Sequence, residues 1–147
     1  MADIVETTSI ARPPGEVWDA LAQFGDIAHW APNVDHSCLT THESEGVGTV
    51  RRVQVGRTAL LERVEEWEPG ERLAYRIEGL PPVVRSVTNT WHLEAAGAST
   101  IVTLTSIVDT GPRPPQQLIA RIVGKGLGKA SREMLAGLRT HLEEGAT

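Results

Sequence analysis

Charged side chains fall on strand faces that are otherwise apolar, where they could bind a ligand or act on it. Arg51 shares a predicted face with Val53 and Val55, and a buried guanidinium requires a partner. Glu62, on the next predicted strand, could be that partner. We favour a structural ion pair that pins the two strands together. The alternative is that Arg51 hydrogen-bonds a ligand carbonyl or enolate and stabilises developing negative charge.

In that alternative a proton donor or acceptor must lie beside Arg51. Glu62 or Tyr75 would then be the general acid or base, so the predicted catalytic residues are Arg51, Glu62 and Tyr75. Tyr75 is the only tyrosine of the chain, and its hydroxyl needs a partner if it is buried. A core tyrosine with a satisfied hydroxyl is the favoured interpretation of this residue.

Small polar residues and large aromatic residues complete the candidate site. Asn89 and Ser106 lie on apolar faces of neighbouring predicted strands, where they either bond each other or contact a ligand. Trp91 and Trp30 could be flat walls for a planar ligand, although large aromatics are more often core. Trp30 and Asn33 are expected at the mouth of the site. The predicted ligand-binding residues are Trp30, Asn33, Arg51, Tyr75, Asn89, Trp91 and Ser106.

Metal and nucleotide chemistry are not expected. His36, Cys38 and His42 would share a strand face, but His42 would lie about 13 Å beyond Cys38, and no fourth ligand is evident. The glycine-rich segment 124–129 lacks the spacing and the preceding strand of a phosphate loop. Its glycines instead suggest that a helix passes close to the sheet or to a cavity. No metal and no cofactor is therefore predicted.

Strands must position most of these residues. Alternating apolar residues between turns predict seven strands: Ile4–Ile10, Val34–His42, Thr49–Val55, Thr58–Trp67, Leu73–Ile77, Val83–Leu93 and Thr100–Asp109. After the first strand come a short helix from Pro14, closed by Gly25, and a second brief helix to Trp30. Long strands joined by short turns predict an antiparallel meander.

A long helix from Pro114 to about Glu144 ends this series of elements. Its apolar residues recur at helical spacing and form one broad stripe, with basic residues mostly off it. The stripe residues are Leu118, Ile119, Ile122, Val123, Leu127, Met134, Leu135, Leu138 and Leu142. Such a stripe needs a wide apolar surface, which the sheet can supply. A sheet wrapped around a helix that does not fill it leaves a cavity.

Composition limits the functional classes. The 147 residues predict a single domain, and the net charge of -5 argues against nucleic acid. Cys38 is the only cysteine, which excludes an internal disulfide and fits a reducing cytoplasm. No apolar stretch is long enough for a membrane span, and no secretory signal is expected. The expected partner is a small hydrophobic ligand, and a homodimer is left open.

The order of elements and several motifs resemble the helix-grip fold of the START and birch-allergen-like superfamily, in its polyketide cyclase/dehydrase branch. The segments that carry the resemblance are Ile10–Trp18, Trp30–Asn33, Gly46–Arg51, Glu62–Val64 and Trp67–Tyr75. The resemblance implies an α+β domain over residues 1–147, in which a curved antiparallel sheet of about seven strands wraps around the C-terminal helix. It also implies a cavity between that sheet and that helix.

Three functions are compatible with this resemblance. The first is binding of a lipid, aromatic or polyketide-like ligand in the cavity. The second is a cyclase or dehydratase that acts on a polyketide-like chain with Arg51, Glu62 and Tyr75. The third is a protein-interaction module of the co-chaperone type, which would show an exposed apolar patch and no internal cavity.

Overall fold

The computed structural model describes residues 2–80, 84–109 and 114–144, without the side chains of residues 2 and 114–124. The elements in chain order are β1 (Ala2–Ile10), α1 (Pro14–Ala22), the 3-10 helix η1 (Phe24–His29), β2 (His36–Leu39), β3 (Val50–Val55), β4 (Thr58–Glu68), β5 (Arg72–Glu78), β6 (Ser86–Ala96), β7 (Ser99–Asp109) and α2 (Pro114–Glu144).

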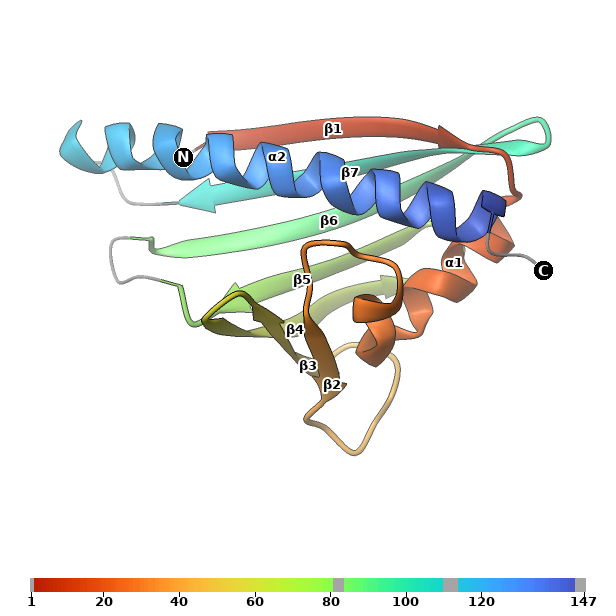
Figure 1. The fold of residues 1–147 in the computed structure, drawn as a ribbon, viewed down its shortest axis with the longest axis horizontal. Coiled ribbons are helices and arrows are strands. Elements are labelled where there is room, and N and C mark those ends of the chain that lie inside the picture. Colours follow the sequence, from red (N-terminus) through yellow and green to blue (C-terminus); the bar gives the residue numbers. More distant parts are fainter. Residues whose placement is uncertain (1, 81–83, 110–113, 145–147) are drawn as a thin grey trace.

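The strands form one antiparallel sheet in the order β1-β7-β6-β5-β4-β3-β2. Consecutive strands from β2 to β7 are neighbours, while the segment with α1 and η1 carries the chain from one edge of the sheet to the other. α1, η1 and α2 all lie on the same face of the sheet, and α2 runs along β1 and β7 (Figure 1). This is the helix-grip fold, so the predicted α+β class and the predicted order of elements are confirmed.

The core lies between the sheet and these helices. Alternation along β6 and β7 buries the side chains that the sequence places inward. They are Val87, Asn89, Trp91 and Leu93 on β6, and Val102, Leu104, Ser106 and Val108 on β7. Leu73, Tyr75 and Ile77 of β5 are buried beside them, and α2 contributes Leu135 and Leu138. The first four residues of the predicted helix stripe have side chains outside the described residues.

Some predicted boundaries and faces are wrong. The strand predicted from Val34 to His42 is only the four residues of β2. The strand predicted from Val83 is observed from Ser86, and residues 81–83 lie outside the described residues. Val55 is 36% exposed because β3 ends there, at the turn into β4.

Gly25 does not close α1, which already ends at Ala22; it lies within η1. A Cβ atom on Gly25 would stand 2.8 Å from Leu39 Cγ. Gly25 therefore allows η1 to pack closely against β2. Ser37 fixes the same contact, because its hydroxyl donates to the Gly25 carbonyl at 2.8 Å and accepts from the Ala28 N–H at 3.0 Å.

Among the described glycines of α2, the tightest contact with another segment is at Gly137, and not at Gly126 or Gly128 of the glycine-rich segment singled out from the sequence. A Cβ on Gly137 would collide with the carbonyl oxygen of Trp30 and would lie 2.6 Å from Pro32 Cδ. A Cβ on Gly126 would meet no atom within 4 Å, and one on Gly128 would make ordinary contacts. Gly124 is among the residues whose surroundings are not described.

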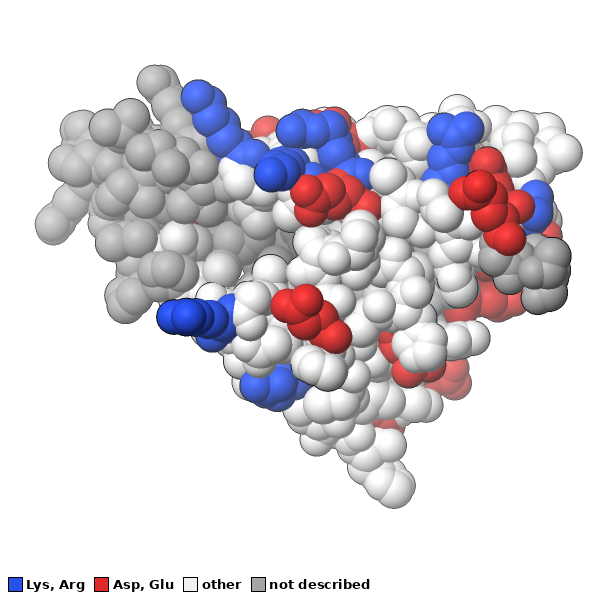
Figure 2. Space-filling model, in the orientation of Figure 1, with Lys and Arg blue, Asp and Glu red and all other residues white. Residues whose placement is uncertain are grey.

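The C-terminal end of α2 is tied to the loop after β1. The Ala11 N–H donates to Glu143 Oε2 at 2.8 Å, and Arg12 Nη2 donates to the Glu143 carbonyl oxygen at 3.3 Å. Basic side chains of α2 lie along its solvent-facing side, interspersed with acidic ones (Figure 2). Two of them are paired, Arg132 with Glu6 at 2.7 Å and Arg139 with Glu143 at 3.4 Å. Arg132 and Arg139 are therefore solvent-exposed side chains that are each paired with a carboxylate.

No helix within the described residues contains a stretch long and apolar enough to cross a membrane.

Candidate functional site

The interior side of β3, β4 and β5 carries a buried ion pair. Arg51 and Glu62 are directly opposite each other in the β3–β4 register, and Arg51 Nε donates to Glu62 Oε1 at 2.7 Å. Their side chains are only 2% and 8% exposed. The pairing predicted from the sequence is present, and the close contact compensates part of the cost of burying both charges.

The Arg51 guanidinium also connects the sheet to η1. Nη1 donates to the Phe24 carbonyl oxygen at 3.0 Å. Cζ lies 3.8 Å from the centroid of the Phe24 ring and 4.6 Å from that of Tyr75. The two rings meet edge to face, with centroids 5.6 Å apart. The guanidinium lies close to both rings and makes favourable cation–π contacts with them. Nη2 is buried and has no hydrogen-bond partner among the described residues.

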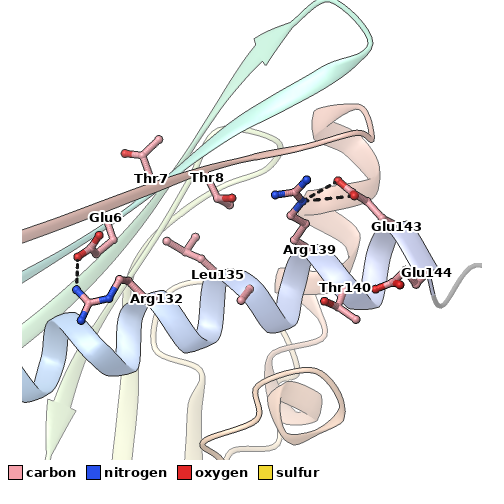
Figure 3. Close-up of a pocket in the computed structure, with 10 residues that line it drawn as sticks. Glu6, Thr7, Thr8, Arg132, Leu135, Arg139, Thr140, Glu143 and Glu144 are labelled. Carbon is pink, nitrogen blue, oxygen red and sulfur yellow. Dashed lines mark hydrogen bonds and ion pairs between the residues drawn. The ribbon is translucent and has the colours of Figure 1, made fainter.

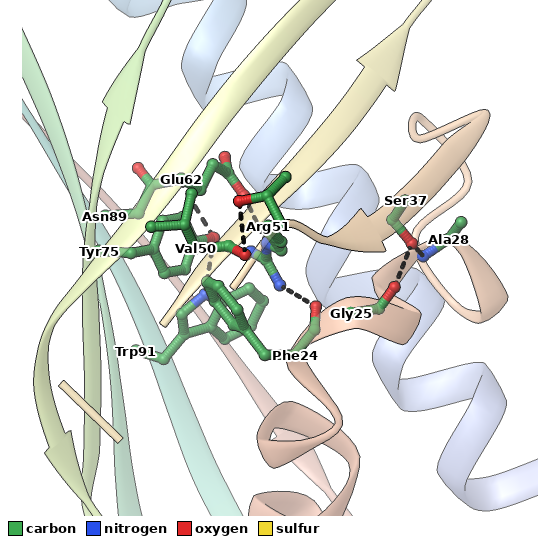
Figure 4. A network of polar contacts seen from close by, with 11 residues as sticks. Phe24, Gly25, Ala28, Ser37, Val50, Arg51, Glu62, Tyr75, Asn89 and Trp91 are labelled. Carbon is green, nitrogen blue, oxygen red and sulfur yellow. Dashed lines mark hydrogen bonds and ion pairs between the residues drawn. The ribbon is translucent and has the colours of Figure 1, made fainter. Parts of the chain in front are cut away.

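Tyr75 links this pair to a chain of hydrogen bonds across β5, β6 and β7, and Figure 4 shows its part around Tyr75, Asn89 and Trp91. Tyr75, Asn89 and Ser106 occupy matching register positions on the three strands. The Ser106 hydroxyl donates to Asn89 Oδ1 at 2.6 Å, and Asn89 Nδ2 donates to the Tyr75 oxygen at 3.4 Å. Trp91 Nε1 donates to the same oxygen at 3.2 Å. Tyr75 thus accepts two hydrogen bonds and retains its own hydroxyl proton as a donor.

Burial raises the pKa of Tyr75 above its ordinary value of 10.0, and the Glu62 charge raises it further. The Arg51 charge and the hydrogen bonds from Trp91 and Asn89 oppose this shift in the pKa without reversing it. Tyr75 is therefore a neutral O–H donor at physiological pH, which suits the role of an acid better than that of a base.

We expect the folded protein to form tyrosinate with a midpoint above pH 10, because its only tyrosine has a raised pKa. A raised pKa in the folded state contributes stability that is complete below the unfolded value and is lost as pH rises through the folded value. The free energy of unfolding should therefore fall above pH 10. A spectrophotometric titration and denaturation at a series of pH values measure both effects. Tyr75→Phe should lose the tyrosinate signal, and a midpoint at or below 10.0 in the folded protein would contradict the assignment.

The structure places Trp30 deeper than its predicted position at a mouth. Trp30 is only 8% exposed, and its ring packs edge to face on Trp91 with 5.7 Å between centroids. Its Nε1 is buried without a partner among the described residues, as is Asn33 Oδ1 in the following turn. Asn33 itself is partly exposed. Trp30 therefore belongs to the same interior as Tyr75 and Trp91, while Asn33 lies at its border.

All seven predicted ligand-binding residues lie in or beside the buried region around Arg51, Tyr75 and Trp91. Two further residues belong to this region but were not predicted as part of the site. Phe24 forms one wall around the guanidinium, and the sequence signal that could have found it is that it is the only phenylalanine. Thr49 is 1% exposed, and its hydroxyl has no partner among the described residues. Strand alternation places Thr49 on the same predicted face as Arg51, two residues along the strand, but Thr49 was not among the predicted ligand-binding residues.

Grooves lined by described residues occur on the surface. One lies between β1 and α2 (Figure 3). Glu6 and Thr8 line it from β1, and Arg132, Leu135 and Arg139 line it from α2. Others lie between η1 and β2 and between α1 and the end of α2. The space between the first half of α2 and the sheet borders side chains outside the described residues. The predicted cavity there stays a prediction.

Within the described ranges, no three His, Cys, Asp or Glu side chains come together as metal ligands. Cys38 is exposed on the edge strand β2.

Comparison with known proteins agrees with this architecture. A family model described as "Polyketide cyclase / dehydrase and lipid transport" matches residues 1–143. Comparison with curated proteins gives no match.

Solved structures with the same fold cover nearly the whole chain. A protein from Thermus thermophilus is 20% identical, with a TM-score of 0.80 over 99% of this chain and 100% of its own. A START superfamily protein from Mycobacterium smegmatis is 12% identical, with a TM-score of 0.77 over 98% and 99%. The Zhui aromatase/cyclase from a Streptomyces species is 19% identical, with a TM-score of 0.74 over 99% and 98%. At these identities the likeness establishes the fold alone.

Proposed function

This chain belongs to the polyketide cyclase/dehydrase and lipid transport family, and from that membership we propose that it binds a small hydrophobic ligand between the sheet and α2. The ligand would be a lipid, an aromatic molecule or a polyketide-like chain. Apolar burial would supply most of the affinity, at about 25 cal/mol per Å². We further propose that residues 1–147 form one domain, because β1 pairs with β7 and α2 packs on β1.

The observation that carries this proposal is a set of buried polar groups whose hydrogen-bonding capacity is not used up. Arg51 Nη2 and Trp30 Nε1 are donors without acceptors among the described residues. The Tyr75 hydroxyl proton is a third available donor. Unsatisfied buried donors are costly, and a bound molecule with oxygen atoms would satisfy them. Asn89 and Ser106 would act through Tyr75, because they hold its oxygen in place.

The purified protein is expected to carry a hydrophobic molecule that native mass spectrometry and organic extraction reveal. Tyr75→Phe removes one donor and should weaken binding of that molecule about three- to tenfold, as expected for one net hydrogen bond. Thr88→Ala, on the opposite face of β6, is the matched control and should leave the affinity unchanged. A protein that neither carries nor binds a hydrophobic molecule would contradict the proposal.

The second candidate function is a cyclase or dehydratase that uses the same interior. The observation that favours it is the contact between Arg51, Glu62 and Tyr75. Arg51 would stabilise an enolate of the substrate, and Tyr75 would protonate a substrate oxygen atom. Glu62 would hold Arg51 in place or accept a proton from the substrate. If so, Tyr75→Phe should lower turnover of a poly-β-keto substrate mimic by about 100-fold or more, while binding changes by less than tenfold. A wild-type protein that binds the mimic without converting it favours the carrier.

The third candidate, an interaction module, has no comparable support. The large apolar side chains exposed among the described residues are Val5, Val47, Val55 and Leu61. Val5 is on β1 at one edge of the sheet, while Val55 and Leu61 are on β3 and β4 toward the other edge. They do not form one apolar patch.

A further inference from the structure

The charges inside the candidate site are balanced before any ligand binds. Arg51 and Glu62 are the charged side chains buried within the described residues, and their contact of 2.7 Å makes the interior neutral overall. A ligand that brings its own charge would therefore leave one charge uncompensated in a buried site. Such a charge is strongly destabilising when no partner and no water compensate it.

Arg51 nevertheless retains hydrogen-bonding capacity. A guanidinium has five N–H donors, and here Nε is used by Glu62 and Nη1 by the Phe24 carbonyl. Nη2, with two N–H groups, is buried and without an acceptor among the described residues. The Phe24 and Tyr75 rings contact the guanidinium and hold it in place. Arg51 can therefore donate to a ligand oxygen without giving up its ion pair.

From these two observations we propose that the site selects neutral carbonyl groups, such as those of ketones, esters, lactones or quinones, on an otherwise apolar molecule. A neutral carbonyl oxygen accepts from Nη2 and adds no charge. A carboxylate accepts as well but makes the buried site negative, and a hydrocarbon leaves Nη2 unsatisfied. Trp30 Nε1, a second buried donor, favours a ligand with a further acceptor oxygen. This inference rests on the proposed ligand-binding function and specifies its ligand class.

Three naphthalenes of similar shape test this selectivity: 2-acetylnaphthalene, 2-naphthoate and 2-ethylnaphthalene. Calorimetry or tryptophan fluorescence at neutral pH gives their dissociation constants for the full-length protein. The ketone is expected to bind about tenfold or more tightly than both others, because only the ketone makes a charge-assisted hydrogen bond without adding charge. Equal affinity for ketone and naphthoate would overturn the inference.

Glu62→Gln is expected to reverse the preference for the ketone over naphthoate, because it changes the net charge of the site. Glutamine keeps an oxygen for Arg51 Nε but removes the negative charge, so the site becomes positive and naphthoate is expected to overtake the ketone. Glu78→Gln is the matched control, because its pair with Arg63 is 40–51% exposed, and the ranking should not change. An unchanged ranking in folded Glu62→Gln would overturn the inference, and if that variant does not fold, the wild-type ranking decides.

The two levels of the proposal fail in distinguishable ways. If none of the three compounds binds, including the hydrocarbon, the ligand-binding function itself is contradicted, and this inference with it. If all three bind with equal affinity, only the selectivity for neutral carbonyls is overturned.

Discussion

Gly137→Ala is expected to lower the free energy of unfolding by about 2 kcal/mol or more. Alanine normally favours a helix over glycine by about 0.8–1 kcal/mol. At this position, however, the new Cβ would collide with the Trp30 carbonyl oxygen and lie 2.6 Å from Pro32 Cδ. Because these are backbone and proline-ring atoms, α2 or the Trp30–Pro32 turn must move. For a chain of this size the melting temperature should fall by about 4–8 °C.

Gly126→Ala is the matched control on the same helix. No atom lies within 4 Å of the Cβ that would be added there, so the helix preference of alanine should act alone and stabilise the protein by up to about 1 kcal/mol. Chemical and thermal denaturation of both variants should thus give opposite signs. If Gly137→Ala were as stable as Gly126→Ala, the close contact between α2 and the Trp30 segment would be contradicted.

Breaking the buried ion pair is expected to have the largest effect on stability. Arg51→Met should lower the free energy of unfolding by about 3–5 kcal/mol, because it leaves the Glu62 carboxylate buried without its cation. The double variant Arg51→Met/Glu62→Leu removes both charges and should recover most of that loss. Urea denaturation of the four proteins in a double-mutant cycle measures the coupling energy.

A second cycle on Arg63 and Glu78 supplies the comparison. This pair joins β4 and β5 at 3.5 Å, but both side chains are about half exposed, so its coupling energy should stay below about 1 kcal/mol. Similar coupling energies for the two pairs would contradict the assignment of Arg51 and Glu62 to a low-dielectric interior. Activity should also be measured in the double variant. Because that variant should stay folded, a loss of activity there would come from the missing Arg51 donor and not from unfolding.

The sequence was most informative where structure depends on local alternation. The inward faces of β6 and β7 were predicted correctly because apolar residues alternate along both strands, and this pattern also identified Asn89 and Ser106 as buried. The contact of Arg51 with Glu62 was predictable for a related reason. The turn at Gly56 and Arg57 fixes the β3–β4 register, and that register places the two residues opposite each other.

Contacts between distant segments could not be predicted in this way. Phe24 reaches Arg51 only because η1 packs against the sheet, and Gly137 matters only because α2 crosses the Trp30 turn. The three glycines of segment 124–129 suggested a close approach of the helix to the sheet or a cavity, yet a Cβ on Gly126 would meet no atom within 4 Å. The depth of Trp30 likewise follows from its contact with Trp91 on a distant strand. The catalytic and ligand-binding roles of these residues stay predictions.

The place of β1 in the sheet has a consequence for how the protein is made. Of the seven strands in this sheet, β1 is synthesised first, but among the described residues it pairs with β7, so Ile10 cannot pair before Thr100 is made, nor Ala2 before Val108. The hairpins from β2 to β7 need only near neighbours and can assemble during translation. β1 must therefore stay unpaired without aggregating until β7 has been synthesised, and the charged side chains of Asp3 and Glu6 help to keep the unpaired strand soluble.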